Sequence, residues 1–173
     1  KLVEENQYDT IYHEHFSYFS MISVEKILSS HELRIFDVEE LPTHGGSLRI
    51  YASHNDDTAK PVSKRMTSLI DQEVENGLSS MNYYRSFGER VKETKRKLLE
   101  YLIRIKREGK SIAGYGAPGK GNTLLNYCGI RTDFLDYTVD RSPHKQGNFL
   151  PGTRIPIHSP EQIQRTRPDY LMI

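Results

Sequence analysis

The spacing of apolar residues changes twice along the chain, and the first clear pattern predicts a helix. Ile27 and Leu28 lie three and four residues after Val24, so the three side chains lie on one face of a helix with 3.6 residues per turn. Ser23 is expected to cap this helix, because a serine hydroxyl can accept a hydrogen bond from the free N–H groups at a helix start. The helix is expected to end near His31.

The next pattern alternates apolar and polar residues, which is typical of strands with one buried face. It occupies residues 33–38 and 47–52, on either side of a glycine-rich connection at 42–46. These segments predict an antiparallel hairpin. The polar stretch 53–61 that follows is rich in Asn, Asp and Pro, and we interpret it as a domain boundary.

Helical spacing returns in the middle of the chain. One amphipathic helix is predicted between Val62 and Val74, and a longer one from Val91 to Ile105, ending at Gly109. Basic residues stud the second helix: Lys92, Lys95, Arg96, Lys97, Arg104, Lys106 and Arg107. Such a run is typical of a solvated helix face, so it does not by itself indicate nucleic-acid binding.

From residue 111 onward, strand and helix patterns alternate. The predicted strands are 111–113, 134–139 and 170–173, the predicted helices are 120–128 and 160–165, and the chain returns toward the sheet at 152–157. This alternation predicts parallel strands with covering helices. The expected fold class is therefore α/β, a Rossmann-like parallel sheet preceded by a helix, an antiparallel hairpin and two long helices.

Composition excludes several classes of protein. With 173 residues and a formal net charge of +1, the chain has no overall field that would attract nucleic acid or a membrane surface. Cys128 is its single cysteine, so an intramolecular disulfide and a cysteine-rich zinc site are excluded within the chain. No apolar run approaches the roughly 20 residues of a membrane span, and a cytoplasmic location is expected. The chain opens without methionine and stops in a strand pattern, so we expect it to be part of a longer protein.

The sequence Tyr12-His13-Glu14-His15 concentrates chemistry in four residues. An imidazole can accept a proton at neutral pH, a carboxylate can orient it, and a tyrosine can donate to a developing oxyanion. The segment therefore suits proton transfer. Two alternatives stay open at this point: a His-x-His metal site, and an aromatic segment that serves only as core.

A second candidate site is the glycine pattern Gly114-x-Gly116-x-x-Gly119, which follows a predicted strand and opens a predicted helix. With Asp140 at the end of the next strand, it fits the dinucleotide-binding fingerprint. More generally, glycines let a backbone approach a ligand, and free amides at a helix start attract phosphate. Lys120 adds a positive charge there, although it can equally point into water. The glycines can also serve only the tight turn.

Other features of this region argue against a dinucleotide. Pro118 lies inside the glycine loop, and Asp140 is followed by a basic loop that contains Arg141 and His144. That loop leaves the carboxyl end of a strand, which is where open α/β sheets bind ligands.

Three ordered motifs together carry a resemblance that covers nearly the whole chain. They are the segment 12–20 (YHEHFSYFS), the turn 44–49 (HGGSLR) and the loop 114–122 (GYGAPGKGN) followed by Leu124, Leu125 and Asn126. They resemble the SAM-dependent sugar C-methyltransferases, most closely the 3-C-methyltransferases of deoxysugar pathways. The resemblance implies that residues 1–53 are the tail of a class I methyltransferase domain and residues 54–173 a Rossmann-like C-terminal domain, truncated at its end.

The resemblance also implies roles for individual residues. Similar enzymes remove the C3 proton of a nucleotide-linked 4-keto sugar, so His15 is expected as general base, Glu14 as the group that orients it, and Tyr12 as a donor to the sugar or its enolate oxygen. His13 is left out, because its side chain would point away if the segment were extended. The expected substrate-binding residues are His44, Gly114, Gly116, Lys120, Asp140, Arg141 and His144.

The expected partner is a nucleotide-linked sugar, and the nucleotide is expected to be dTDP. S-adenosylmethionine and zinc are expected to bind domains that this sequence does not contain, because no SAM-type glycine loop and no zinc cysteines have a counterpart here. No metal site is expected in this chain, and the chain alone is expected neither to bind S-adenosylmethionine nor to be active as an enzyme. Two other hypotheses stay open: an NAD(P)-binding oxidoreductase domain, suggested by the glycine loop and Asp140, and a non-catalytic docking module.

Overall fold

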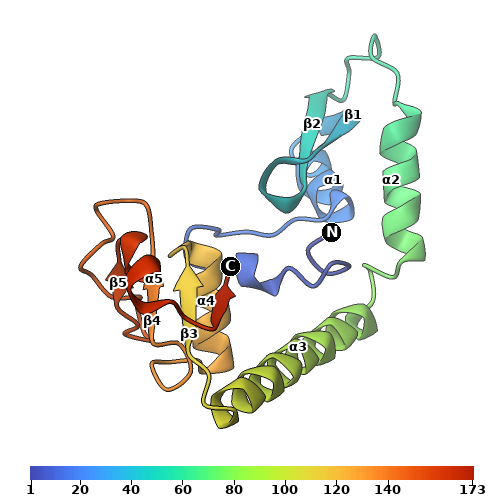
Figure 1. Ribbon diagram of the computed structural model, residues 1–173. Coiled ribbons are helices and arrows are strands. Elements are labelled where there is room, and N and C mark those ends of the chain that lie inside the picture. The colour runs from blue at the N-terminus through green and yellow to red at the C-terminus, as the bar shows by residue number, and fades with distance from the viewer. The chain divides into compact units, whose positions relative to one another are not determined.

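The computed structural model describes residues 1–173 and divides into two compact units (Figure 1). The N-terminal unit comprises residues 1–6 and 16–88, and the C-terminal unit comprises residues 7–15 and 89–173. Residues 7–15 therefore belong to a different unit from the residues on either side of them, and they pack with the C-terminal part of the chain. The predicted boundary between residues 53 and 54 concerns domains of the longer protein, which a division into compact units does not test, so it stays a prediction.

The N-terminal unit is built on the predicted antiparallel hairpin. Strand β1 (Leu33–Leu41) pairs with β2 (Ser47–His54), and the helices α1 (Met21–Ser29) and α2 (Lys64–Glu75) pack against it. Both strands extend beyond their predicted ends. A small apolar core holds the unit together: Met21, Ile35, Val38 and Met66 are buried. The polar stretch 53–61 connects β2 to α2 within this unit.

The cap of α1 differs from the sequence prediction. Ser20, not Ser23, is the N-cap, and its hydroxyl accepts a hydrogen bond from the Ser23 N–H at 3.2 Å. Ser23 instead completes a capping box, because its hydroxyl accepts from the Ser20 N–H. The Glu73 carboxylate of α2 accepts from the N–H groups of Met21 and Ile22 at 2.8 and 2.9 Å. A contact from a residue distant in sequence thus helps to set the start of this helix.

Helix α3 (Met81–Arg107) is longer than its apolar spacing indicated (Figure 1). Three of its basic residues pair with carboxylates: Lys92 lies 2.7 Å from Glu89, Arg96 lies 3.4 Å from Glu93 and Lys106 lies 3.4 Å from Asp136. Such exposed ion pairs contribute little stability, but they agree with the prediction of a solvated charged face. Neither α3 nor any other helix combines the length and the apolarity that crossing a bilayer requires.

The C-terminal unit confirms the predicted α/β class. Its elements are β3 (Ile112–Tyr115), α4 (Gly119–Cys128), β4 (Tyr137–Val139), β5 (Ile157–His158), α5 (Glu161–Thr166) and β6 (Tyr170–Met172). All four strands are parallel, in the order β5-β4-β3-β6. The chain thus builds the sheet outward from β3 on one side and then places β6 on the other side of β3, which is the order of a Rossmann-like sheet.

Helices cover the two faces of this sheet unequally. The larger core joins α3 and α4 to one face, through Leu102, Ile105, Ile112, Leu125, Cys128, Ile130, Leu135, Leu150, Ile155 and Ile157. A smaller cluster of Ala113, Tyr137 and Val139 lies on the other face, against Ile163 of α5. Side chains alternate along a strand, so Ile112 and Ala113 of β3 enter different clusters.

The predicted strand 134–139 is wrong in its first half. Phe134 and Leu135 form a turn instead, since their N–H groups donate to the Arg131 carbonyl at 3.0 and 2.9 Å. Leu135 is nevertheless 2% exposed, so its burial produced an apolar signal without a strand. The prediction that the chain returns to the sheet near residue 157 is confirmed by β5.

Asp169 joins the starts of the neighbouring strands β3 and β6. Its carboxylate accepts hydrogen bonds from the Ser111 N–H and hydroxyl, both at 2.9 Å, and the Lys110 ammonium lies 3.2 Å away. The bonds from Ser111, with the lysine, lower the pKa of Asp169 from 3.8 to about 2. A carboxyl whose pKa is lower in the folded state stabilises the fold above its unfolded pKa, and this stabilisation is lost as pH falls through the folded value.

We therefore expect the Asp169→Asn substitution to flatten the acid dependence of unfolding. The parent protein should lose part of its free energy of unfolding as pH falls from about 4 to about 2, and the variant should lose less. Urea unfolding at several pH values across this window measures the difference. The exposed Asp133 is the control, because Asp133→Asn should leave the slope of the parent protein in place; an identical slope for Asp169→Asn would contradict the assignment.

Candidate functional site

The strand order of the C-terminal unit creates one position where a ligand site is favoured. From β3 the chain runs to β4 and β5 on one side of β3, and it then crosses to β6 on the other side of β3. The direction in which strands are added therefore reverses between β3 and β6, at the carboxyl ends of these strands. Open α/β sheets bind ligands at such a switch point. The segment that leaves β3 here is the glycine loop 116–118, which leads directly into α4.

The backbone of the glycine loop is fixed from β4. Gly116 has a φ of 103°, which favours glycine, and its N–H donates to the Val139 carbonyl at 2.6 Å. The Thr138 hydroxyl donates to the Gly116 carbonyl at 2.8 Å. Gly114 makes room for this threonine, because a Cβ at Gly114 would lie 2.7 Å from the Thr138 Oγ1. Gly114 therefore has a packing reason and Gly116 a backbone reason, and their predicted contact with substrate stays a prediction.

Asp140 ties the glycine loop to the loop that follows β4. Its Oδ2 accepts from the Ala117 N–H and its Oδ1 from the Ser142 N–H, both at 2.8 Å. The Lys145 ammonium donates to the same Oδ2 at 3.3 Å and to the Ala117 carbonyl at 2.9 Å. Burial favours the neutral acid, but the two N–H donors and the ammonium outweigh it, and the pKa of Asp140 is lowered.

This arrangement gives Asp140 a partner set that the sequence did not reveal. In the dinucleotide fingerprint, the acid at this point accepts from a ribose, whereas both oxygens of Asp140 accept from the protein's own loops. The sequence did not predict that Lys145 and Thr138 hold these loops. Lys145 carried a weak signal, as a basic residue in the loop after β4, and Thr138 carried none.

The other predicted ligand contacts surround the same edge. Lys120 is half-buried in the first turn of α4, and Arg141 and His144 are exposed on the loop after β4. The His144 carbonyl accepts from the Asn148 side chain at 3.0 Å, which shapes that loop. The structure thus brings Lys120, Arg141 and His144 into the C-terminal unit with the glycine loop, on the segments that follow β3 and β4.

The segment that contains Tyr12 to His15 is anchored on helix α4. It begins with a short 3-10 helix, Tyr8–Thr10, and Tyr8 is 8% exposed. The Tyr8 ring packs edge-on against Tyr127, with centroids 5.2 Å apart, and its hydroxyl lies 3.8 Å from the Cys128 Sγ. Burial, together with the Cys128 contact, raises the pKa of Tyr8. This tyrosine is therefore an anchor, held against the C-terminal end of α4.

Tyr12 to His15 form a turn rather than an extended segment. The His15 N–H donates to the Tyr12 carbonyl at 3.0 Å, and the two rings meet edge-on with centroids 4.8 Å apart. His13 lies farther from Tyr12, at 6.1 Å between ring centroids. His13 was expected to point away because side chains alternate along an extended segment. The segment is a turn, so that reason does not apply to His13. Glu14 and both histidines are exposed.

The two main candidate motifs meet at one contact that sequence analysis did not foresee. A Cβ built on Gly119, the first residue of α4, would lie 3.1 Å from Cε2 of Tyr12. The Tyr12 ring therefore rests on the helix that the glycine loop opens. Of these two residues, only Gly119 had a sequence signal that pointed to this contact. It is a glycine at the first position of a helix, where other residues are also accepted.

His44 belongs to the N-terminal unit and is described with it. It lies in the hairpin connection, in a short 3-10 turn (Thr43–Gly45), with a φ of 55° followed by positive φ at Gly45 and Gly46. The connection thus needs glycine for its backbone, and His44 is exposed at its tip. Its predicted contact with substrate stays a prediction.

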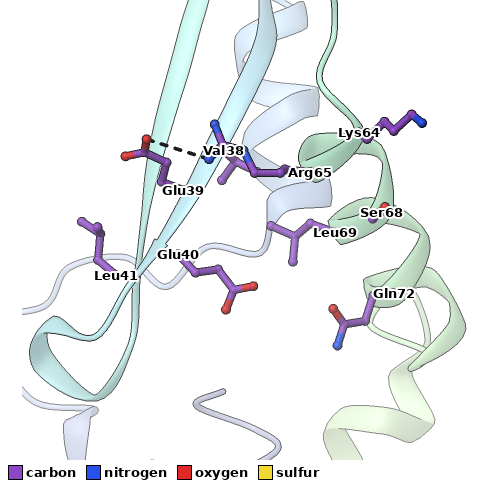
Figure 2. Close-up of a pocket in the computed structure, with 9 residues that line it drawn as sticks. All are labelled: Val38, Glu39, Glu40, Leu41, Lys64, Arg65, Ser68, Leu69 and Gln72. Carbon is purple, nitrogen blue, oxygen red and sulfur yellow. Dashed lines mark ion pairs between the residues drawn. The ribbon is translucent and has the colours of Figure 1, made fainter.

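A groove in the N-terminal unit contains none of the predicted site residues. It has a volume of about 570 Å³ between β1 and α2, and its lining residues are Val38, Glu39, Glu40, Leu41, Lys64, Arg65, Ser68, Leu69 and Gln72. Figure 2 shows Arg65 of α2 reaching across to Glu39 of β1, an ion pair of 4.0 Å. Arg65 also pairs with Asp37, which lowers the pKa of Asp37 to about 2.

The side chains described do not form a metal centre. No group of three or more His, Cys, Asp or Glu side chains is arranged to hold an ion. The His-x-His pair of the Tyr12 to His15 segment therefore lacks the further ligands that a stable zinc or iron site needs. Cys128 is buried beside Tyr8, where burial raises the pKa of its thiol.

Comparison with known proteins identifies relatives of the whole chain. The family described as "C-methyltransferase C-terminal domain" matches residues 42–173. The chain is also 38% identical, over 175 aligned residues, to C-methyltransferase NovU of Streptomyces niveus. The alignment covers 100% of this chain and 41% of that relative, so the chain spans about two fifths of the relative's length.

The Asp140 contacts predict a clear effect of substitution. Asp140→Asn replaces one acceptor oxygen by an N–H donor that faces another donor, so we expect a loss of about 1–3 kcal/mol in the free energy of unfolding. The Ala117 and Ser142 amides should exchange hydrogen faster, which NMR can measure. Lys145→Met removes only the ammonium and should have the smaller effect. Unchanged protection of the Ala117 amide in Asp140→Asn would contradict the proposed role of the carboxylate.

Proposed function

Because the chain belongs to the C-methyltransferase family, we propose that it supplies the general base and part of the sugar-nucleotide site of an enzyme that methylates C3 of a nucleotide-linked 4-keto sugar. One observation carries the proposal. The segment with the candidate base, Tyr12 to His15, packs on the first residue of the helix that follows the glycine loop. Base and candidate ligand loop therefore belong to the same compact unit.

The chemistry follows from the acidity of a carbon beside a ketone. His15 accepts the C3 proton, and the electron pair of the broken C–H bond forms an enolate whose negative charge lies mainly on the ketone oxygen. Glu14 stabilises the imidazolium that results. Tyr12, whose ring meets that of His15 at 4.8 Å, donates a hydrogen bond to the sugar or to the enolate oxygen. The enolate carbon would then displace a methyl group from its donor: the new C–C bond forms as the bond between the methyl group and the donor breaks, and the electron pair of that bond leaves with the donor.

The glycine loop and its surroundings suit the nucleotide end of such a substrate. Free N–H groups at the start of α4 and the Lys120 ammonium attract a diphosphate. Arg141 and His144 lie on the neighbouring loop and add positively charged or hydrogen-bonding groups. Asp140 acts indirectly in this proposal, because its carboxylate holds the two loops together. His44 lies in the N-terminal unit, and its contact with the sugar nucleotide stays a separate prediction.

S-adenosylmethionine is the methyl donor that methyltransferases generally use, and it would supply the methyl group in this reaction. We assign none of its contacts to this chain, because the single glycine loop is the one proposed for the sugar nucleotide. Zinc does not fit the residues present, since no group of three ligands occurs and the one cysteine is buried against Tyr8. No step of the proposed mechanism involves zinc.

Two other functions are less well supported. An NAD(P)-dependent oxidoreductase was suggested by Asp140 as a ribose ligand, and this carboxylate bonds to the loops on both sides instead. A docking module without a catalytic role gives no reason for the contact between Tyr12 and Gly119. The family match favours methyl transfer over both.

We expect His15→Ala to reduce kcat by about 10²- to 10⁴-fold in the longer enzyme that contains this chain, because a positioned base contributes about that much. Binding of S-adenosylmethionine, measured by calorimetry, should stay nearly unchanged. His13→Ala is the matched control, since it removes a neighbouring exposed imidazole. Full turnover by the His15 variant would overturn the base assignment, and loss of turnover only in the His13 variant would transfer the role to that residue.

Lys120→Ala tests the nucleotide end of the site. Loss of a charge-assisted contact of about 1.5 kcal/mol corresponds to roughly a tenfold weaker affinity for a dTDP-sugar, with kcat affected less. Steady-state kinetics and calorimetry measure the two effects separately. Lys97→Ala, on the exposed face of α3, removes an equal charge away from the loop and should have no effect. An unchanged KM for the Lys120 variant would remove this lysine from the site.

A further inference from the structure

We propose that Gly119 is a positioning residue: its lack of a side chain seats the Tyr12 ring on α4 and thereby sets the place of His15. The inference rests on the proposed function of the segment Tyr12 to His15. It gives the glycine motif a second role, because its last glycine would orient the catalytic segment rather than only admit a phosphate.

The backbone at Gly119 does not require glycine. The φ of Gly119 is not in the positive range, whereas Gly116 in the same motif has a φ of 103°. It is the first residue of a regular helix. Alanine is the better helix former at such a position. A reason for glycine at this site must therefore come from its surroundings.

The surroundings supply that reason in the Tyr12 ring. An added Cβ would lie 3.1 Å from Cε2, 3.3 Å from Cζ and 3.5 Å from Cδ2 of Tyr12. Carbon atoms in contact prefer about 3.5–4.0 Å, so the first two distances are too short. Cζ carries the Tyr12 hydroxyl. A methyl group at this position would thus push the side of the ring that bears the proposed hydrogen-bond donor.

The segment has little freedom to absorb such a push. Tyr8 is held at the other end of α4 by Tyr127, at 5.2 Å between ring centroids, and by the Cys128 thiol. The Thr10 hydroxyl donates to the Gln7 carbonyl at 2.8 Å and closes the short turn that contains Tyr8. The segment is thus anchored at Tyr8, and the added methyl group moves the Tyr12 ring relative to this anchor.

A shift of Tyr12 reaches His15 by two routes. The rings touch edge-on at 4.8 Å, and the His15 N–H donates to the Tyr12 carbonyl at 3.0 Å. Displacing the tyrosine thus displaces the imidazole relative to the sheet and the ligand loop. The added methyl group requires the Tyr12 ring to move by a few tenths of an ångström. Because misplacing a catalytic group by about 1 Å can lower a rate by about 10²-fold, we expect a smaller loss from this shift.

The test is Gly119→Ala in the longer enzyme, alone and combined with Tyr12→Ala. We expect the single variant to lower kcat by about 3- to 10-fold. Its affinity for dTDP, measured by calorimetry, should stay within about twofold of the parent enzyme, because the effect acts on the base and not on the diphosphate. A kcat equal to that of the parent enzyme would overturn the inference.

The alternative, that Gly119 lets the diphosphate approach the backbone, has a different signature. The added methyl group would then weaken dTDP binding, and it would do so equally with Tyr12 or with Ala at position 12. That result would overturn the positioning role and leave the proposed sugar-nucleotide site in place.

Stability gives a readout that does not depend on activity. With Tyr12 present, Gly119→Ala should lower the unfolding midpoint by at least about 2 °C; with Tyr12→Ala, the same methyl group should lower it no further. Gly88→Ala is the control for helix propensity alone, because a Cβ at Gly88 meets nothing within 4 Å. Equal effects in both backgrounds would refute the contact, and full turnover by Tyr12→Ala alone would instead refute the proposed role of Tyr12.

Discussion

The ionised carboxylate of Asp140 is the interaction on which the candidate site depends. Its two oxygens accept one N–H from the loop after β3 and one from the loop after β4, both at 2.8 Å. Parallel strands bring the starts of these loops together, but only a group with several acceptor sites can hold both of them. Burial opposes the charge, but the N–H donors and the Lys145 ammonium outweigh it, so the pKa of Asp140 is lowered and the charged form is favoured.

Helix α4 has the second organising role in the C-terminal unit. It packs on the sheet through Leu125 and Cys128, so it is part of the main core. Its opposite ends hold Tyr12 and Tyr8, which fixes a segment from far upstream in the sequence. A rigid helix is a better support for a catalytic segment than a loop, because its own hydrogen bonds leave it little freedom. The site thus combines a base on a short turn with a support from the core.

The sequence predicted the elements better than their boundaries. The hairpin, the helices and the parallel sheet followed from periodicity, since burial on one face imposes spacing on the chain whatever the rest of the protein does. The prediction failed at Ser20, where the cap depends on a reciprocal bond and on Glu73, and at Leu135, which is buried without belonging to a strand. At Ser20 the contact with Glu73 comes from a residue distant in sequence, and at Leu135 the burial comes from packing in the core, so local patterns record neither.

The same division holds for the candidate site. The sequence alone determined the family, because the motifs around Tyr12, His44 and Gly114 have enough chemistry and order to be specific, and it named His15 as the candidate base. Only the tertiary structure showed that Tyr12 rests on Gly119 and that Asp140 bonds to Ala117 and Ser142. These partners lie 107, 23 and 2 positions apart, and the longer contacts arise from packing on a common core, whose geometry depends on the whole unit at once.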